Sequence, residues 1–317
     1  MGEVTIYYAA DIHGSDRCWR KFLNAAEFYG AAVLILGGDV TGKVLVPIVG
    51  REGRWIGRIL GETKVAETRE ELSELERIVQ ANGLYPYVCE QYEYERLQKD
   101  EPYRRKVFSE RMRDGLARWI ELADERLRGA GIECYVMPGN DDELGIEDVI
   151  EGSATVVNPE NRVVDIGGGE LERISCGWAN PTPWNSPREC PDEELGVKIG
   201  EMLPGLTGTK PAIFNLHVPP RASGLDWAPR LTPDLRPIQQ GGELQMEPVG
   251  STSVDVALRE GQPLLGLHGH IHESRGVARI GQTVSLNPGS RYGMGALDGA
   301  LITVSRGKVK SYQLVSG

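Results

Sequence analysis

The sequence predicts an α/β fold in which short buried strands end in polar residues. Its first segment alternates a strand over residues 4–10, a helix over 18–29 and a strand over 32–36. This order is a βαβ unit, for which a parallel pair of strands and a right-handed connection are expected. Further short apolar runs recur along the chain, and several end in Asp, Asn or His. Ligands of such sheets gather beyond the carboxyl ends of the strands, so we expect the functional site there.

Length and composition indicate one large globular domain, or one domain with an insertion. The chain has 317 residues and 40% hydrophobic content, enough to bury a sizeable core. Its five cysteines are scattered and form no Cys-x-x-Cys pair, which argues against a disulfide framework or a zinc knuckle. The N-terminus runs directly into a strand, and no apolar run approaches the roughly 18 residues of a membrane span. We therefore expect a soluble, unprocessed, cytoplasmic protein without a membrane partner.

The charge balance bears on the class of partner. The formal net charge is −11, whereas proteins that bind the nucleic-acid backbone broadly rely on clustered Lys and Arg. Nucleic acid is therefore a disfavoured partner. A small phosphate-containing substrate held by metal ions remains compatible with an acidic chain.

The first two predicted strands end in groups that can bind a metal. Asp11 and His13 follow the first strand, and Asp39 follows the second after Gly37-Gly38, which leave room for close approach. Each carboxylate also has an ordinary structural role open to it, Asp11 as a helix cap and Asp39 as a turn former. Together, at neighbouring strand ends, they indicate a binding site.

The character of the chain changes over residues 43–131. A hairpin is predicted over residues 43–60, a helix with a capping-box start over 68–82, and a long amphipathic helix over 103–128. We interpret this segment as a largely helical insertion that forms a cap beside the site. Surface helices without a role at the site are the alternative.

The core pattern resumes at residues 132–137, an apolar run that ends in Pro138-Gly139-Asn140-Asp141. Shorter strands are predicted over residues 155–157, 163–166 and 171–176, and a helix over 191–202.

Two loops stand out in this half of the chain. Residues 177–190 carry tryptophans and prolines that could line a pocket, although tryptophans that pack a surface loop are the commoner case. A strand over 212–216 then ends in His217. Residues 219–250 form a long stretch without periodicity, and that length usually means a functional or mobile loop.

Three of the five histidines fall in one short run, as His268, His270 and His272. They follow the apolar residues 264–267, and alternation along an extended chain predicts all three on one side. Neutral imidazole is the commonest transition-metal ligand in proteins. After this run we expect a strand over 283–286, a tight turn over 287–290, and two terminal strands, over 300–304 and 309–314.

Five blocks, in order, resemble the signature of the metallophosphoesterase (calcineurin-like phosphoesterase) superfamily. The blocks are Asp11-x-His13, Gly38-Asp39, Gly139-Asn140, His217 after an apolar strand, and Gly269-His270-x-His272. The turn Asn287-Pro288-Gly289-Ser290 matches a further segment often seen after the last block. The resemblance implies a four-layer αββα sandwich of two mixed β-sheets flanked by helices, formed by a single domain over residues 1–317 that includes the segment 43–131.

The resemblance also implies a site for two metal ions. Asp11, His13 and His272 would hold the first ion. Asn140, His217 and His270 would hold the second, and Asp39 would bridge both. Mixed nitrogen and oxygen ligands suit manganese, iron, zinc or cobalt better than calcium.

The chemistry that follows is hydrolysis of a phosphate ester, with phosphodiesters slightly favoured. Two divalent cations less the charges of Asp11 and Asp39 leave roughly +2, a field that draws a phosphate. A water that bridges the ions loses its proton near neutral pH and attacks in line. Asp39 and Asn140 would therefore serve catalysis as well as metal binding, and no other cofactor is predicted.

The chain departs from the family pattern after Asn140. Most relatives have a histidine there that protonates the leaving group, and this chain has Asp141. With a reference pKa of ~3.9, an exposed aspartate is ionised at pH 7 and is a poor acid. His268 is the candidate substitute, although its place one step before the ligands favours a supporting role. Four loop residues are weaker candidates for phosphate contact: Arg221, Arg230, Arg291 and Tyr292.

Two alternatives stay open. A nuclease-type member of the superfamily would show a basic groove or tail, which this acidic chain lacks. A non-catalytic metal-binding scaffold that uses the segment 43–131 to bind a partner would show lost ligands, and none of the seven is lost. A homo-oligomer is compatible with the sequence.

Overall fold

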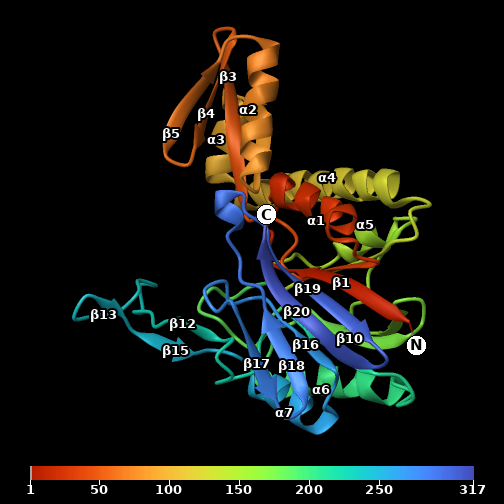
Figure 1. Cartoon of the computed structure of the whole chain (residues 1–317). Coiled ribbons are helices and arrows are strands. Elements are labelled where there is room, and N and C mark those ends of the chain that lie inside the picture. The colour runs from red at the N-terminus through yellow and green to blue at the C-terminus, as the bar shows by residue number, and fades with distance from the viewer. Residues whose placement is uncertain (1) are drawn as a thin grey trace.

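The computed structural model describes residues 2–317, and its centre is a pair of six-stranded sheets packed face to face (Figure 1). The first sheet has the order β20-β19-β1-β2-β7-β8 and the second β17-β18-β16-β11-β10-β9. The strands of the first are β1 (Glu3–Ala9), β2 (Val33–Gly37), β7 (Glu133–Met137), β8 (Val156–Val157), β19 (Asp298–Ser305) and β20 (Lys308–Ser316). Those of the second are β9 (Val163–Ile166), β10 (Leu171–Cys176), β11 (Ala212–Leu216), β16 (Leu265–Leu267), β17 (Gly276–Ile280) and β18 (Thr283–Asn287).

Both sheets are mixed. In the first, β1, β2, β7 and β8 are parallel, and β19 and β20 run antiparallel beside them. In the second, β10, β11, β16 and β18 are parallel, with β9 and β17 as antiparallel edges. The parallel strands of each sheet end at the same edge, which positions the residues that follow them.

Helices cover the outer faces. α1 (Asp16–Tyr29), α4 (Glu101–Leu127) and α5 (Glu147–Glu151) pack on the first sheet, and α6 (Asp192–Met202) and α7 (Thr252–Gly261) on the second. Between the sheets lies a third apolar layer that includes Ile6, Tyr8, Leu265 and Leu267. Burial of each such side chain contributes about 1.5–3 kcal/mol, so these layers hold the sandwich together. The predicted four-layer αββα architecture is confirmed.

Ser15, not Asp11, caps the first helix. The Ser15 hydroxyl accepts a hydrogen bond from the Cys18 amide, and Gly30 ends α1 in the left-handed conformation. Trp19 of α1 stacks on Trp119 of α4 at 5.3 Å between ring centroids. Asp11 therefore does not serve as the helix cap, which was the structural role that the sequence left open for it.

The segment 43–131 carries a sheet of its own as well as helices. Its strands β3 (Val44–Arg51), β4 (Arg54–Ile59), β5 (Glu62–Ala66) and β6 (Leu84–Glu90) lie in the order β5-β4-β3-β6, with α2 (Arg69–Ala81) and α3 (Gln91–Lys99) beside them. The β3–β4 hairpin agrees with the sequence, whereas β5, β6 and α3 were not predicted. β6 contains Pro86, and as an edge strand it tolerates the missing amide.

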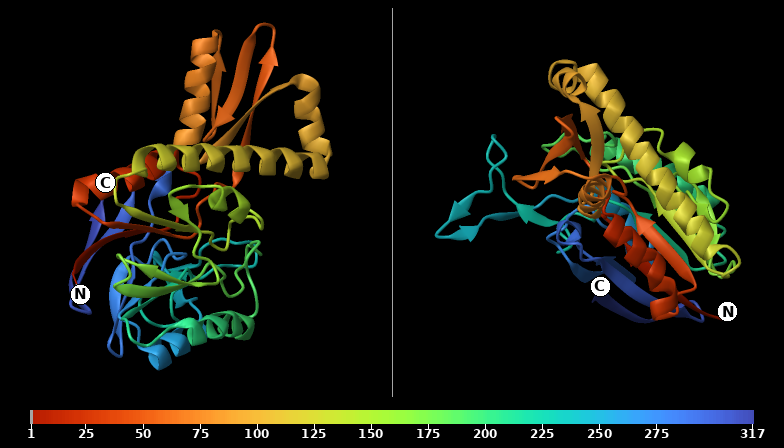
Figure 2. Two further views of the ribbon diagram at one scale, coloured as in Figure 1. Left: turned by 90° about the vertical axis from the view of Figure 1, so that its right-hand side faces the viewer. Right: turned by 90° about the horizontal axis from the view of Figure 1, so that it is seen from above.

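In Figures 1 and 2, α4 lies between this small sheet and the sandwich. The segment leaves the sandwich after β2 and returns at β7, and these two strands pair directly, from Val33 with Glu133 onward. We propose on this ground that residues 1–317 are one domain into which residues 43–131 are inserted.

Residues 219–250 form a thin extension rather than an unstructured loop (Figures 1 and 2). Within it β12 (Trp227–Pro229) pairs with β15 (Met246–Pro248), and β13 (Gln239–Gln240) with β14 (Glu243–Leu244). Short 3₁₀ turns follow elsewhere at Leu203–Gly205 and Tyr292–Met294. Among the described residues, no helix combines the length and apolar character that a membrane crossing requires.

Candidate metal centre

The seven residues predicted as metal ligands come together where the strands of both sheets end. Asp11 and His13 follow β1, Asp39 follows β2, and Asn140 follows β7. From the second sheet, His217 follows β11, and His270 and His272 follow β16. All except His270 and His272 are buried, and these two are half-buried.

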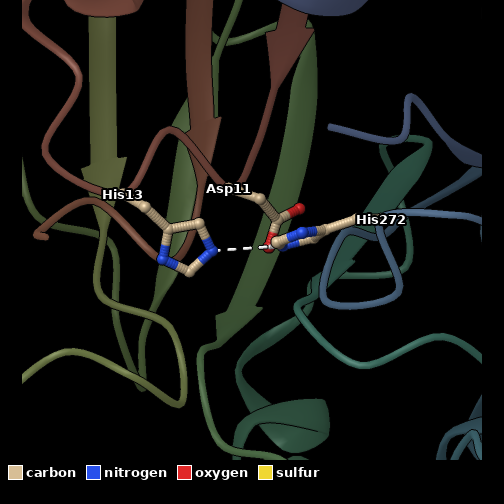
Figure 3. A group of neighbouring side chains, drawn as sticks. All are labelled: Asp11, His13 and His272. Carbon is tan, nitrogen blue, oxygen red and sulfur yellow. Dashed lines mark hydrogen bonds and ion pairs between the residues drawn. The ribbon is translucent and has the colours of Figure 1, made fainter. Parts of the chain in front are cut away.

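Asp11, His13 and His272 form one group (Figure 3). Each offers a ligand atom within 4.8 Å of those of the other two. His13 Nε2 lies 3.1 Å from His272 Nε2, and Asp11 Oδ1 lies 3.6 Å from the same His272 atom. The three side chains therefore converge on one point.

Asp39, His217 and His270 form a second group with the same 4.8 Å spacing. Asn140 belongs with it, because its Oδ1 lies 3.1 Å from His217 Nε2 and 2.7 Å from His270 Nδ1. His217 Nδ1 lies 2.8 Å from the Gly37 carbonyl oxygen. A proton on Nδ1 donated to that carbonyl leaves the lone pair of Nε2 facing the group, which is the form that binds a metal.

Asp39 lies between the two groups. Its Oδ2 is 3.6 Å from His13 Nε2, and its Oδ1 is 3.4 Å from His217 Nε2. The two oxygens of one carboxylate thus face different groups, as a bridging ligand requires.

Four of the seven residues have backbone φ angles that side chains rarely adopt. The angles are +57° at Asp11, +40° at His13, +52° at Asp39 and +66° at His270. Such a conformation costs on the order of 1–3 kcal/mol per residue, and strain of this kind clusters at functional sites. Backbone bonds hold it: the Asp11 amide donates to the Gly38 carbonyl at 3.0 Å, and the His13 amide to that of Asp39 at 3.0 Å.

Glycines let the ligand side chains approach the backbone closely. A Cβ at Gly38, whose φ is +110°, would lie 2.4 Å from His217 Nδ1. One at Gly139 would lie 2.3 Å from Asp39 Oδ1. No larger residue fits at these positions without moving a ligand.

Asp142 ties the loops after β2 and β7 together, a role that the sequence analysis missed. Its buried carboxylate accepts hydrogen bonds from the amides of Val40 (3.0 Å), Thr41 (2.8 Å) and Gly139 (2.7 Å). The sequence offered one signal for this role. Two carboxylates, Asp141 and Asp142, follow Gly139-Asn140, and no role had been assigned to Asp142.

The turn predicted over residues 287–290 supports the histidine loop from below. The Asn287 side-chain amide donates to the carbonyls of Gly269 at 3.2 Å and Ile271 at 2.9 Å. The Ser290 hydroxyl donates to the Asp11 carbonyl at 2.6 Å. This interpretation of the turn is confirmed.

Three of the ligand residues have protonation states that suit a cation. The pKa of His13 is lowered to about 3, mainly by burial and to a smaller extent by the neighbouring His272 and Lys43. Burial, followed by His217, lowers the pKa of His270 to about 3. Burial alone would raise the pKa of Asp11, but the histidines around it, His272 first, hold that pKa well below its usual range. Neutral imidazoles and an ionised carboxylate are the forms in which these groups bind transition metals. Two other ligand residues depart from this pattern: against the effect of burial, the neighbouring Asp39 raises the pKa of His217 to about 10, and burial raises the pKa of Asp39 to about 7.

Asp141 is not available as a proton donor. It forms an ion pair with Lys43 and accepts a hydrogen bond from the Ser186 hydroxyl at 2.6 Å. Burial would raise its pKa, but Lys43 and Ser186 outweigh burial and lower the pKa to about 2. Asp141 is therefore ionised and cannot act as a general acid. Any part that it plays in catalysis is that of a carboxylate. Neither Lys43 nor Ser186 was predicted.

His268 is not the substitute acid. Its ring is fully buried, and its Nδ1 lies 2.8 Å from the Leu216 carbonyl oxygen. Leu265 and Leu267 face the layer between the sheets, so alternation turns His268 to the opposite face of the sheet, where burial lowers its pKa to about 4. The prediction of three histidines on one side was wrong, because β16 ends at Leu267 and the backbone turns at His270.

Three of the four weaker candidates for phosphate contact lie away from the site, whereas Tyr292 lies beside two of the ligand histidines. Arg291 pairs with Asp298 at 2.7 Å, and Tyr292 packs its ring 4.6 Å from that of His13. Arg221 and Arg230 are exposed on the 219–250 extension. None of the four lines the cavity over the cluster.

That cavity has a volume of about 880 Å³. Its floor includes Asp39, Asn140, Asp141, His270 and His272. Its walls come from the loop 177–190 and the extension 219–250, whereas the segment 43–131 contributes Lys43 alone. This lining gives no support to the expectation that the segment forms a cap beside the site.

No family model matches the chain. An uncharacterized protein of Methanocaldococcus jannaschii is 28% identical over 159 residues, which are 50% of this chain and 64% of that protein. The matched part thus spans less than two thirds of that curated relative.

Solved structures share the fold at low sequence identity. One crystal structure aligns with a TM-score of 0.56 at 14% identity and covers 98% of this chain and 99% of its own. The protein TT1561 of Thermus thermophilus aligns with a TM-score of 0.51 at 12% identity, over 95% of this chain and 98% of its own. In its ordered motifs, its paired sheets and the place where its motif residues meet, the chain resembles the metallophosphoesterase superfamily.

Proposed function

We propose that this protein is a phosphoesterase that depends on two divalent metal ions and hydrolyses a small phosphate ester, with phosphodiesters favoured over monoesters. The observation that carries the proposal is the position of Asp39, whose two oxygens face the two groups of ligand atoms at 3.6 and 3.4 Å. Manganese, iron, zinc and cobalt suit these nitrogen and oxygen donors.

The ligand assignment follows the two groups. Asp11, His13 and His272 would hold one ion, and Asn140, His217 and His270 the other, with Asp39 shared. The carboxamide oxygen of Asn140 adds a ligand without adding negative charge. Held there, two divalent ions would act as Lewis acids on the phosphoryl oxygens and bring the pKa of a coordinated water near neutrality.

The residues of the chain itself set the charge around the phosphate position. Asp11 and Asp39 are buried at 0% and 1% exposure, so their fields act with little solvent screening. Lys43 is half-exposed over the cavity, where its ammonium fixes Asp141 and adds positive charge near the phosphate position. Because Asp141 is held as a carboxylate and His268 is remote, the leaving group departs without a proton from either of them.

The site favours this function over the two alternatives. Among the described residues that line the cavity, Lys43 is the one cation, and Asp141 already pairs with it. A nuclease groove needs several cations to follow the phosphate backbone. A non-catalytic scaffold would show lost ligands, whereas all seven ligand residues are present and come together at the strand ends.

The test is hydrolysis of bis-p-nitrophenyl phosphate and p-nitrophenyl phosphate by protein stripped with chelator and then reloaded with Mn²⁺. We expect activity only after reloading, and loss of it in Asp39→Asn. Hydrolysis that persists in chelated protein, or at wild-type rate in the reloaded Asp39→Asn variant, would contradict the proposal.

A further inference from the structure

We propose that the cavity over the cluster selects phosphodiesters that carry a bulky apolar ester group, over small or polyanionic phosphate esters. The inference rests on the proposed function, since that function places the phosphate on the floor of this cavity. The inference adds the chemical nature of the ester group that contacts the cavity walls.

The first wall is apolar and already formed. Pro181, Pro183 and Trp184 line it, and the Trp184 side chain is 64% exposed. A hydrogen bond from the Trp184 amide to the Thr182 hydroxyl, at 3.2 Å, fixes the turn that presents the indole. An exposed indole beside a ligand pocket offers a large apolar face to a ligand ring or chain.

A second part of the lining is apolar as well. It comes from the extension 219–250 and includes Pro229, Leu231, Pro233, Leu235 and Pro237. Proline lacks an amide proton and has a fixed φ, so it offers no donor and loses little freedom when a ligand binds. The two walls together favour an apolar group that needs no hydrogen-bond partner.

The extension that carries this second wall is anchored at its base beside the metal ligands. The Ser274 hydroxyl donates to the Trp227 carbonyl at 2.8 Å, and Ser274 lies two residues after His272. The Asn287 side chain bonds the Leu225 carbonyl at 3.3 Å while it also holds the histidine loop. The base of the extension that carries this wall is therefore held by residues that also support the metal site.

Charge in the cavity excludes further phosphates. The one lining cation among the described residues, Lys43, is paired with Asp141, while Glu247 and Glu273 add exposed carboxylates to the lining. A second or third phosphate on the substrate would find no partner there and would meet these carboxylates. Repulsion of this kind is an effective source of specificity.

The experiment compares two diesters with the same leaving group, methyl p-nitrophenyl phosphate and phenyl p-nitrophenyl phosphate. We expect kcat/KM to be about ten- to a hundredfold higher for the phenyl ester, the range that a modest apolar contact gives. Trp184→Ala should remove most of that preference, because the larger loss of kcat/KM should fall on the phenyl ester. Tyr92→Ala is the matched control, because this aromatic side chain is 70% exposed and does not line the cavity.

A binding measurement separates the two proposals. Diphenylphosphinate and dimethylphosphinate cannot be hydrolysed, and calorimetry on the metal-loaded protein gives their affinities. Tighter binding of diphenylphosphinate that depends on Trp184, without turnover of any ester, would support the apolar site and contradict the phosphoesterase function. Turnover with equal kcat/KM for the two diesters and no effect of Trp184→Ala would overturn the inference and leave the function standing.

Discussion

The imidazole rings of His13 and His272 face each other through their Nε2 atoms, which lie 3.1 Å apart (Figure 3). The two residues come from different sheets and are 259 positions apart in the chain. Asp11 Oδ1 approaches the same point, 3.6 Å from His272 Nε2. A cation bound at this point would link the two ring nitrogens and the carboxylate oxygen, and it would thereby stabilise the folded state.

The first prediction is that metal stabilises the fold through these residues. A site that binds only the folded state contributes about 2.7 kcal/mol when the free ion is at a hundred times its Kd. Adding Mn²⁺ to chelated protein should therefore raise Tm in calorimetry, and His272→Ala should reduce the rise. Glu67→Gln, an exposed carboxylate far from the cluster in sequence, is the control that keeps the full rise. An equal rise in His272→Ala would remove this residue from the ligand set.

The second prediction concerns the leaving group. With Asp141 ionised and His268 buried on the other face of its sheet, alkyl diesters should turn over far more slowly than p-nitrophenyl diesters. General acid catalysis is worth about 10²–10⁴-fold, and Asp141→His should restore part of it for alkyl esters alone. Steady-state kinetics on matched aryl and alkyl diesters, with His268→Ala beside them, give the comparison. Equal wild-type rates on both substrates would mean that another residue supplies the proton.

The third prediction is a pH dependence of stability at Glu160. Burial, with Glu147 as a further contributor, raises the pKa of Glu160 to about 7, although its carboxylate accepts the Gly177 amide at 2.9 Å. The folded state therefore holds a proton that the unfolded state releases from pH 4.5 upward. Its contribution is fully present below pH 4.5 and is lost as the pH rises to about 7.

Glu160→Gln should abolish this loss. The variant should gain stability over wild type as pH rises, by roughly 3 kcal/mol at most above pH 7, and should match it near pH 4. Urea unfolding at a series of pH values measures the difference, with Glu67→Gln as control. A difference between wild type and Glu160→Gln that is constant across the series would show that Glu160 does not titrate there.

The fourth prediction concerns backbone approach. Gly139→Ala would place a Cβ 2.3 Å from Asp39 Oδ1, so it should displace the bridging carboxylate and lower metal content and activity together. Gly200→Ala is the matched control, because a Cβ there meets nothing within 4 Å and the residue lies in α6. We expect the control to stabilise the protein by about 0.5–1 kcal/mol. Normal metal content in Gly139→Ala, measured by elemental analysis, would be inconsistent with this packing.

The four layers were implied by the resemblance to the metallophosphoesterase superfamily, whereas the positions of the motif residues follow from one local pattern in the sequence. Several buried apolar runs end in polar residues, and parallel strands bring such ends to one edge. Asp11, Asp39 and His217 lie where that pattern puts them. Their role as metal ligands stays a prediction.

The rest depends on contacts that no local pattern contains. The pairing of Lys43 with Asp141 joins the insertion to the loop after β7, and neither residue has a sequence signal for the other. The orientation of the His268 side chain could not be predicted without knowing where β16 ends. A shift of one residue along an extended chain turns a side chain to the other face of the sheet. The short strands β12 to β15 lack periodicity because the extension is exposed and buries little apolar surface.

The number of metal ions per chain tests the central claim most directly. Protein loaded with Mn²⁺ and then desalted should contain close to two ions per chain by elemental analysis, and Asp39→Asn should contain fewer than one, because this variant weakens both positions at once. A ratio near one or zero for the wild type, or two ions retained by Asp39→Asn, would contradict the account.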